Sequence, residues 1–175
     1  MRIADLNLPD NHWLLRAVVK DEDIEVINDK VVWKSGTWKN GTWWDGTWQD
    51  GTWQGGTWKN GAWKNGVWQD GTWQAGIWRN GVWQDGTWQS GTWKGGTWLN
   101  GTWQNGTWWD GVWQSGIWWD GTWRNGTWWD GTWQNGTWRG GTWKTGTWQN
   151  GTWWDGVWQS GIWRTGNIRS TIAPR

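Results

Sequence analysis

One large apolar residue stands at every fifth position of most of this chain, and the residues between are small or polar. Tryptophan keeps this spacing from Trp33 to Trp163, and glycine keeps it from Gly36 to Gly166. Each unit reads Gly, usually Thr, Trp, a mostly polar residue, then Asn, Asp, Ser or Gly. A period of five fits neither an α-helix nor a plain strand. We therefore expect each unit to be a short extended piece that ends in a corner such as Asn-Gly or Asp-Gly.

Such units can be joined as a chain of hairpins or as a solenoid. Asn-Gly between alternating residues is a strong hairpin signal. In an antiparallel meander, however, two-residue turns require an even number of residues per strand, and each unit has three. A meander would also leave the tryptophans uncovered on one face of an open sheet. The pattern therefore favours a parallel β-solenoid, in which the chain turns the same way at every corner.

Alternation along each extended piece predicts which side chains face inward. The residue after tryptophan is Lys or Arg in ten of the 27 in-phase units and Gln in eleven, so this position must face water. Tryptophan then points inward, and the neighbouring glycine is expected to leave room for its ring. The expected core comprises Trp33, Trp38, Trp43, Trp48, Trp53, Trp58, Trp63, Trp68, Trp73, Trp78, Trp83, Trp88, Trp93, Trp98, Trp103, Trp108, Trp113, Trp118, Trp123, Trp128, Trp133, Trp138, Trp143, Trp148, Trp153, Trp158 and Trp163.

Two patterns compete over the number of units in one coil. An Asn corner recurs in every fourth unit, at Asn40, Asn60, Asn80 and Asn100. A Val before tryptophan recurs at multiples of three units, as a three-sided coil would prefer, at Val67, Val82, Val112 and Val157. The corner pattern is the more extensive. We therefore expect an all-β fold, a parallel β-solenoid (β-helix) with four sides and about 20 residues per coil.

The chain divides into three zones. Residues 1–30 are expected to form an N-terminal cap with short strands in "LLRAVV" and "DIEVI", separated by the acidic turn "KDED". Residues 31–165 are the tryptophan repeat, and residues 166–175, "GNIRSTIAPR", are a C-terminal tail. An open solenoid end exposes unpaired strand edges, and the short tail is a poor cap. We therefore expect a homo-oligomer, or docking on a partner, through a solenoid end.

Composition and charge narrow the function. The chain has 33 Trp and 30 Gly residues, and it has no Cys, so no disulfide can form. The beginning of the chain lacks the pattern of a secretory signal peptide, and no stretch approaches the ~18–20 apolar residues of a membrane span. We therefore expect no membrane contact and a cytoplasmic or virion-associated location. The formal net charge of +1 does not favour nucleic acid as a partner.

Residues capable of catalysis are scarce. His12 is the only histidine and is expected at the surface, and no serine is paired with a base. The phosphate-loop and dinucleotide glycine patterns are missing because tryptophan occupies every unit. Four units per coil would stack Asp50 on Asp70 and Asp110 on Asp130, which could hold Ca²⁺, but we interpret these aspartates as ordinary corner residues. We expect no enzyme, no catalytic residue, no cofactor and no metal site.

Five tryptophans fall outside the five-residue spacing of the repeat and should point outward: Trp44, Trp109, Trp119, Trp129 and Trp154. With four units per coil, Trp109 and Trp129 would stack on one side. Exposed aromatic rows can hold a glycan or a partner protein, although repeat drift or packing between subunits would also explain them. Lys, Arg and outward Trp together could suit single-stranded nucleic acid, but the repeat carries only ten basic against eight acidic residues, so the attraction is weak.

The spacing, with a large central residue facing inward and a small residue two before it, resembles the pentapeptide-repeat family across residues 31–170. The resemblance implies a right-handed, four-sided β-helix, with Trp in the usual Leu or Phe place and Gly in the usual Ala place. The family prefers Asp or Asn directly before the central residue, where this chain has Thr. The Gly-Thr-Trp-x-Asn texture also looks like Trp-Gly repeats of uncharacterised tailed-phage proteins, which implies a virion or host-interaction setting.

Together these patterns predict a non-enzymatic structural or interaction module. The alternative is a carbohydrate-binding module that uses the outward tryptophans.

Overall fold

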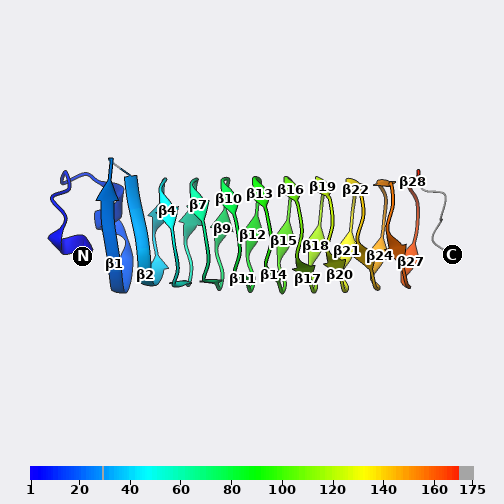
Figure 1. The fold of residues 1–175 in the computed structure, drawn as a ribbon, viewed down its shortest axis with the longest axis horizontal. Helices are drawn as coiled ribbons and strands as arrows, with labels where there is room; N and C mark the ends of the chain where they lie inside the picture. The colour runs from blue at the N-terminus through cyan, green and yellow to red at the C-terminus, as the bar shows by residue number, and fades with distance from the viewer. Residues whose placement is uncertain (29, 170–175) are drawn as a thin grey trace.

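The computed structural model describes residues 1–28 and 30–169 as a long rod, with the N-terminal segment at one end and the last described strand, β28 (Asn167–Ile168), at the other (Figure 1). Its helices are two short 3-10 helices, η1 (Ile3–Asp5) and η2 (Trp13–Arg16), and none in the described ranges is long and apolar enough to cross a membrane. All other elements are β-strands. The prediction of an all-β parallel β-solenoid is confirmed. Residues 170–175 of the expected tail lie outside the described residues.

The solenoid has three sides, and each strand pairs in parallel with the strand three units further on. Thr47 pairs with Ala62, for example, and Trp48 with Trp63. One side forms a separate sheet of nine strands, one for each coil. The prediction of four sides, with four units in each coil, is therefore wrong, and the spacing of the four valines indicated the correct coil. Nine coils at about 4.8 Å each make a shaft about 43 Å long.

The three sides are named here by one of their strands. After β1 (Val18–Ile27), strand β2 (Lys30–Asn40) supplies the first rungs of two sides. The β4 face contains β4 (Thr47–Trp48), β7 (Ala62–Trp63), β10 (Ile77–Trp78), β13 (Thr92–Trp93), β16 (Thr107–Trp108), β19 (Thr122–Trp123), β22 (Thr137–Trp138), β25 (Thr152–Trp153) and β28 (Asn167–Ile168). The β5 face contains β5 (Thr52–Trp53), β8 (Val67–Trp68), β11 (Val82–Trp83), β14 (Thr97–Trp98), β17 (Val112–Trp113), β20 (Thr127–Trp128), β23 (Thr142–Trp143) and β26 (Val157–Trp158). The β6 face contains β3 (Thr42–Trp43), β6 (Thr57–Trp58), β9 (Thr72–Trp73), β12 (Thr87–Trp88), β15 (Thr102–Trp103), β18 (Ile117–Trp118), β21 (Thr132–Trp133), β24 (Thr147–Trp148) and β27 (Ile162–Trp163).

Tryptophan fills the whole interior. The in-phase tryptophans from Trp33 to Trp153 are fully buried, and the last two, Trp158 and Trp163, are partly buried. Indoles three units apart stack with ring centroids 4.7–5.0 Å apart and planes within 5–7° of parallel. Indoles of adjacent units meet edge to face at 5.6–6.1 Å. Three such rings fill the centre of a triangular coil, whereas a fourth side would separate rings that now touch.

Two backbone hydrogen bonds per unit join each coil to the coil before. The N–H of Thr57 donates to the Gly41 carbonyl at 2.9 Å, and the N–H of Lys59 donates to the Trp43 carbonyl at 2.8 Å. The indole N–H groups are served less well. Three of them donate to a corner carbonyl of the next coil, as Trp148 does to Thr165 at 3.0 Å, but 22 buried indole N–H groups in the described ranges have no acceptor. The core therefore depends on ring packing rather than on polar contacts.

The N-terminal end of the core is covered by the two 3-10 helices and β1. Strand β1 is one antiparallel partner of β2 with a bulge near Asp21, rather than two short strands separated by a turn. Part of the expected first strand lies in η2 instead, where Leu14 is fully buried. The Trp13 ring meets Trp43 edge to face at 5.2 Å. It therefore covers the start of the indole stack.

Glycine is required at the corners chiefly because the backbones of adjacent coils approach closely there, and less because the indole needs space. Gly96 has φ +109°, and a Cβ there would lie far inside van der Waals contact of the Gly81 carbonyl oxygen in the previous coil. Its neighbour Gly95 lacks a positive φ, and the nearest atom to a Cβ would be the Arg79 carbonyl oxygen at 3.6 Å. The expectation that glycine leaves room for the ring is therefore incomplete: the stronger constraint is that adjacent coils approach too closely for any side chain.

This adjacent pair gives a direct test of the fold. We expect Gly96→Ala to lower the free energy of unfolding by about 3 kcal/mol or more, because it combines left-handed strain with a backbone clash. Gly95→Ala should change it by less than about 1 kcal/mol. Guanidinium denaturation followed by circular dichroism measures both. Equal effects of the two substitutions would contradict the close approach of the coils.

Candidate functional site

The outward tryptophans are the candidate site. Each follows an in-phase tryptophan, so strand alternation turns its ring away from the core, and each is 45–51% exposed. Trp109 and Trp154 follow β16 and β25 on the β4 face, and Trp129 follows β20 on the β5 face. Trp44 and Trp119 follow β3 and β18 on the β6 face. The prediction that Trp109 and Trp129 stack on one side is wrong, because the four units between them make one coil and a further side.

Most of these rings are covered by a cation from the next coil. The Nζ of Lys59 lies 3.4 Å from the ring centroid of Trp44, and that of Lys144 lies 3.3 Å from Trp129. The guanidinium of Arg124 lies 4.0 Å from the ring centroid of Trp109, and that of Arg169 lies 5.9 Å from Trp154. The fifth ring, Trp119, has Gln134 at the equivalent position. Four of the five are therefore cation–π pairs that brace neighbouring coils.

Every outward tryptophan is followed by an aspartate at the corner. The Asp110 carboxylate accepts a hydrogen bond from the Gly111 N–H at 2.8 Å, and Asp130 accepts one from Gly131 at 2.7 Å. The interpretation of corner aspartates as turn-forming residues agrees with these bonds. The predicted stacking of Asp50 on Asp70, and of Asp110 on Asp130, is wrong, because each pair is four units apart and a coil has only three. No group of three metal-ligating side chains occurs in the described ranges.

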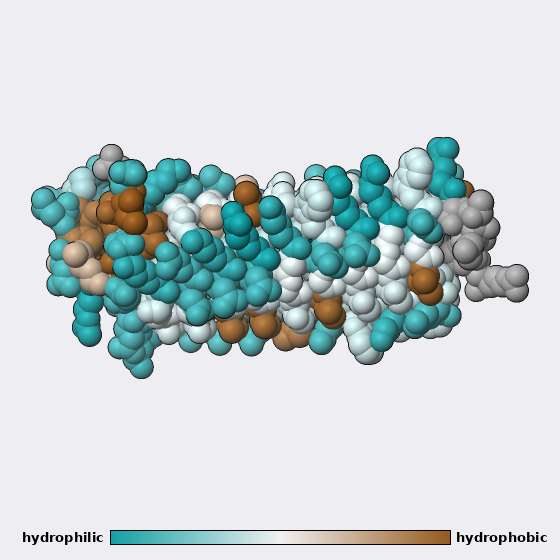
Figure 2. Space-filling model, in the orientation of Figure 1, coloured by the Kyte–Doolittle hydropathy of each residue, from teal (hydrophilic) through white to brown (hydrophobic). Residues whose placement is uncertain are grey.

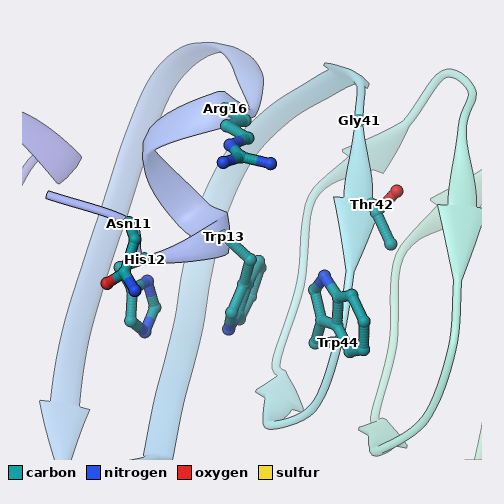
Figure 3. A pocket seen from close by; sticks show the side chains of 7 residues that line it. All are labelled: Asn11, His12, Trp13, Arg16, Gly41, Thr42 and Trp44. Atoms are coloured by element: carbon teal, nitrogen blue, oxygen red, sulfur yellow. The ribbon is translucent and has the colours of Figure 1, made fainter. Parts of the chain in front are cut away.

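A pocket lies between the cap and the first coil. Trp13 from η2 and Trp44 from the end of β3 both point into it, with Arg16 nearby (Figure 3). His12 lies beside Trp13, with ring centroids 5.3 Å apart, and its Nδ1 accepts the Leu14 N–H at 3.2 Å. His12 is partly buried rather than at the open surface, and it helps to begin η2. Sequence reasoning missed the role of Trp13, whose only signal was an aromatic residue in an otherwise ordinary segment.

Several charged groups of the cap are paired, with residues of the first coil or within the cap. Lys34 Nζ lies 2.6 Å from a Glu25 carboxylate oxygen, and this hydrogen bond raises the pKa of Lys34. Lys30 pairs with Asp45 at 3.7 Å. The hydrogen bond from the N-terminal ammonium of Met1 lowers the pKa of Asp23. These pairs are at least partly exposed, and the two made by Lys34 and Lys30 join the cap to the first coil with modest energy.

Comparison of the chain with protein-family models, with curated proteins and with solved structures finds no match. The five-residue repeat in a β-solenoid is consistent with a pentapeptide-repeat-like architecture.

The cation–π pairs can be measured by a double-mutant cycle. We expect Trp129→Gln and Lys144→Gln to be coupled by about 0.5–1 kcal/mol in the free energy of unfolding, because the pair is exposed. Urea denaturation of the two single variants and the double variant gives this value. The matched control is Trp119→Gln with Gln134→Ala, where no cation is present and the coupling should be near zero. Equal coupling in the two cycles would contradict the cation–π assignment.

Proposed function

We propose that this chain is a non-enzymatic structural or interaction module that acts as a stiff rod. The observation that carries the proposal is the continuous column of fully buried indoles from Trp33 to Trp153. Each ring is stacked on the rings of the coils before and after it, so bending the rod would separate many contacts at once. A stiff element of this kind suits a virion or a cell-surface assembly, the setting that the phage-like repeat texture implies.

Some polar residues of the shaft stabilise the solenoid itself. Corner carboxylates accept glycine N–H groups, as Asp70 does from Gly71 at 2.6 Å. Four of the outward cations cover tryptophan rings. The face of the shaft in Figure 2 is a mixture of hydrophilic and intermediate residues, with only a few hydrophobic ones. These features support a role in assembly or binding rather than in catalysis.

The C-terminal end of the shaft is the proposed docking surface, and a second copy of the chain is its proposed occupant. Trp158 and Trp163 are partly exposed there, although the equivalent rings in earlier coils are fully buried. Val157 and Ile162 beside them are 56% and 55% exposed. A second solenoid end presents the same flat indoles and strand edges, so the two ends are self-complementary.

The oligomeric state tests this docking surface. We expect the weight-average mass of the chain to rise above 20.5 kDa with concentration in analytical ultracentrifugation. Val157→Lys with Ile162→Lys should return it to the monomer, because charges would be buried at the interface. The matched control, Ile77→Lys with Ile117→Lys, adds the same charges in the middle of the shaft and should leave association unchanged. A monomeric mass at all concentrations would remove the proposed self-association.

A carbohydrate-binding module is the second candidate. The ring of Trp119 is 51% exposed, and no cation among the described residues lies over it, so one of its faces can contact a sugar ring. We expect Trp119→Thr to abolish retention on a glycan array if this function is correct, while the thermal unfolding midpoint stays unchanged. Trp109→Thr with Trp129→Thr is the comparison, because cations already cover those two rings. Retention that survives Trp119→Thr would exclude this ring as the sugar site.

A further inference from the structure

The three-unit coil places an unbroken row of cations and tryptophans on one side of the rod. The row occupies the position directly after each strand on eight consecutive rungs of the β4 face, where the strand ends in tryptophan on seven rungs and in Ile168 on the last. We name it the cation ladder: Lys64, Arg79, Lys94, Trp109, Arg124, Arg139, Trp154 and Arg169. Six of its eight members are cations, and all eight are exposed.

The rungs are held in register by the backbone. The N–H of each ladder residue donates to the carbonyl of a tryptophan in the coil before, at 2.7–2.8 Å. Arg124, for example, donates to Trp108, and Arg139 donates to Trp123. Rungs about 4.8 Å apart make a straight row about 34 Å long. The charges are therefore arranged along a rigid line, not scattered over a flexible surface.

The ladder cations are not neutralised by neighbouring carboxylates. None of the six takes part in an ion pair in the ranges that the structure describes. The corner residue after each of the first five cations is uncharged: Asn65, Asn80, Gly95, Asn125 and Gly140. The aspartates of this row follow only the tryptophan rungs. Both Asp110 and Asp155 are hydrogen-bonded to the next glycine N–H, at 2.8 and 2.7 Å.

The cations are unevenly distributed over the three sides, so the low net charge does not argue against a polyanionic partner on the β4 face. The balance of ten basic and eight acidic residues in the repeat is an average over three sides. The β4 face carries six of these ten cations, one of which, Lys34, is paired with Glu25, and the other two sides carry two each. A ligand on one side of the rod interacts mainly with the charges of that side, because salt largely screens exposed charges that are more than about 10 Å away.

The chemistry of the ladder identifies the class of ligand. The side chains of Lys, Arg and Trp can donate hydrogen bonds but cannot accept them. The row therefore suits a polymer whose backbone offers only hydrogen-bond acceptors, at regular intervals. A phosphodiester backbone meets this condition, whereas each sugar of an anionic glycan also brings hydroxyl donors. Four of the six cations are arginines, which bind phosphate in a bidentate manner.

The two tryptophans of the ladder add a surface for bases. A hollow beside the Trp109 ring is lined by Lys94, Asp110 and Asn125, and the Arg124 guanidinium lies 4.0 Å from the ring centroid. Aromatic rings within a basic row stack unpaired bases without sequence preference. We propose that the cation ladder binds single-stranded nucleic acid, with phosphates along the cations and bases against the parts of the Trp109 and Trp154 rings that Arg124 and Arg169 leave exposed, since these side chains are 45% and 48% exposed.

Matched charge variants test the proposal. The probe is a labelled oligothymidylate of about 20 nucleotides, longer than the 4–16 nucleotides that single binding domains cover. We expect Lys94→Gln, Arg124→Gln and Arg139→Gln together to weaken binding about 100-fold or more at 50 mM salt. The control, Lys59→Gln, Lys144→Gln and Arg164→Gln together, removes the same charge from the other two sides and should weaken it less than about 10-fold. The logarithmic salt slope should fall from about −4 to about −2 in the ladder variant alone.

A pair of deletions tests whether the alignment of the ladder, rather than its number of charges, determines binding. Deleting residues 111–115, which carry no charge, turns Arg124 and all later rungs onto another side and splits the ladder. Deleting residues 111–125 removes one aspartate and one arginine but keeps the remaining rungs in line. We expect the first deletion to weaken binding about 100-fold and the second less than about 10-fold, with both thermal unfolding midpoints close to that of the full chain.

Three results would overturn the proposal. One is an oligonucleotide affinity that changes equally in the ladder variant and its control. Another is equal binding by the two deletion variants. The third is ladder-dependent binding of heparin or of duplex DNA without binding of the oligothymidylate, which would assign the row to a different polymer.

Discussion

The structure depends on a match between two distances. Parallel β-strands of successive coils lie about 4.8 Å apart, and the indole rings that they carry stack with centroids 4.7–5.0 Å apart. One backbone ladder therefore places every ring in contact with the rings above and below it. The arrangement requires the same residue at the same place in every coil, which explains why the five-residue spacing never slips between Trp33 and Trp163.

The same match explains the other repeated residue. Adjacent coils can approach this closely only where the corner has no side chain and a positive φ, as at Gly96. The residues that face outward are under no such constraint, since they contact only water and their neighbours on the same side. The interior is therefore uniform and the exterior is variable, and the exterior residues that lie side by side belong to every third unit. Binding functions of this chain belong to that exterior pattern.

Much of the fold follows from the sequence by elementary arguments. The five-residue period, the odd strand length and the polar residue after each tryptophan predict a parallel β-solenoid with an indole core. The number of sides is harder to predict from the sequence. Asn, Asp, Ser and Gly are nearly interchangeable at corners, and their recurrence in every fourth unit corresponds to no contact in the structure. The valines at 67, 82, 112 and 157 share one side, but so few apolar residues carried less weight than the corners.

The candidate site could be predicted only in part. Alternation was enough to turn Trp44, Trp109, Trp119, Trp129 and Trp154 outward. Their neighbours depend on the number of sides, so the pairing of Trp109 with Arg124 and the whole cation ladder were invisible under a four-sided coil. Trp13 lies outside the repeat, and only the folded cap shows that it covers the end of the core.

The number of units in a coil is tested most directly by pyrene excimer emission, since the chain has no native cysteine. Gln104→Cys is combined either with Gln89→Cys, three units away, or with Gln84→Cys, four units away, and both pairs are labelled with pyrene maleimide. The three-sided coil predicts strong excimer emission from the pair that includes Gln89 and monomer emission from the pair that includes Gln84. The reverse result would contradict the three-sided coil and, with it, the arrangement of the core and of the outer rows.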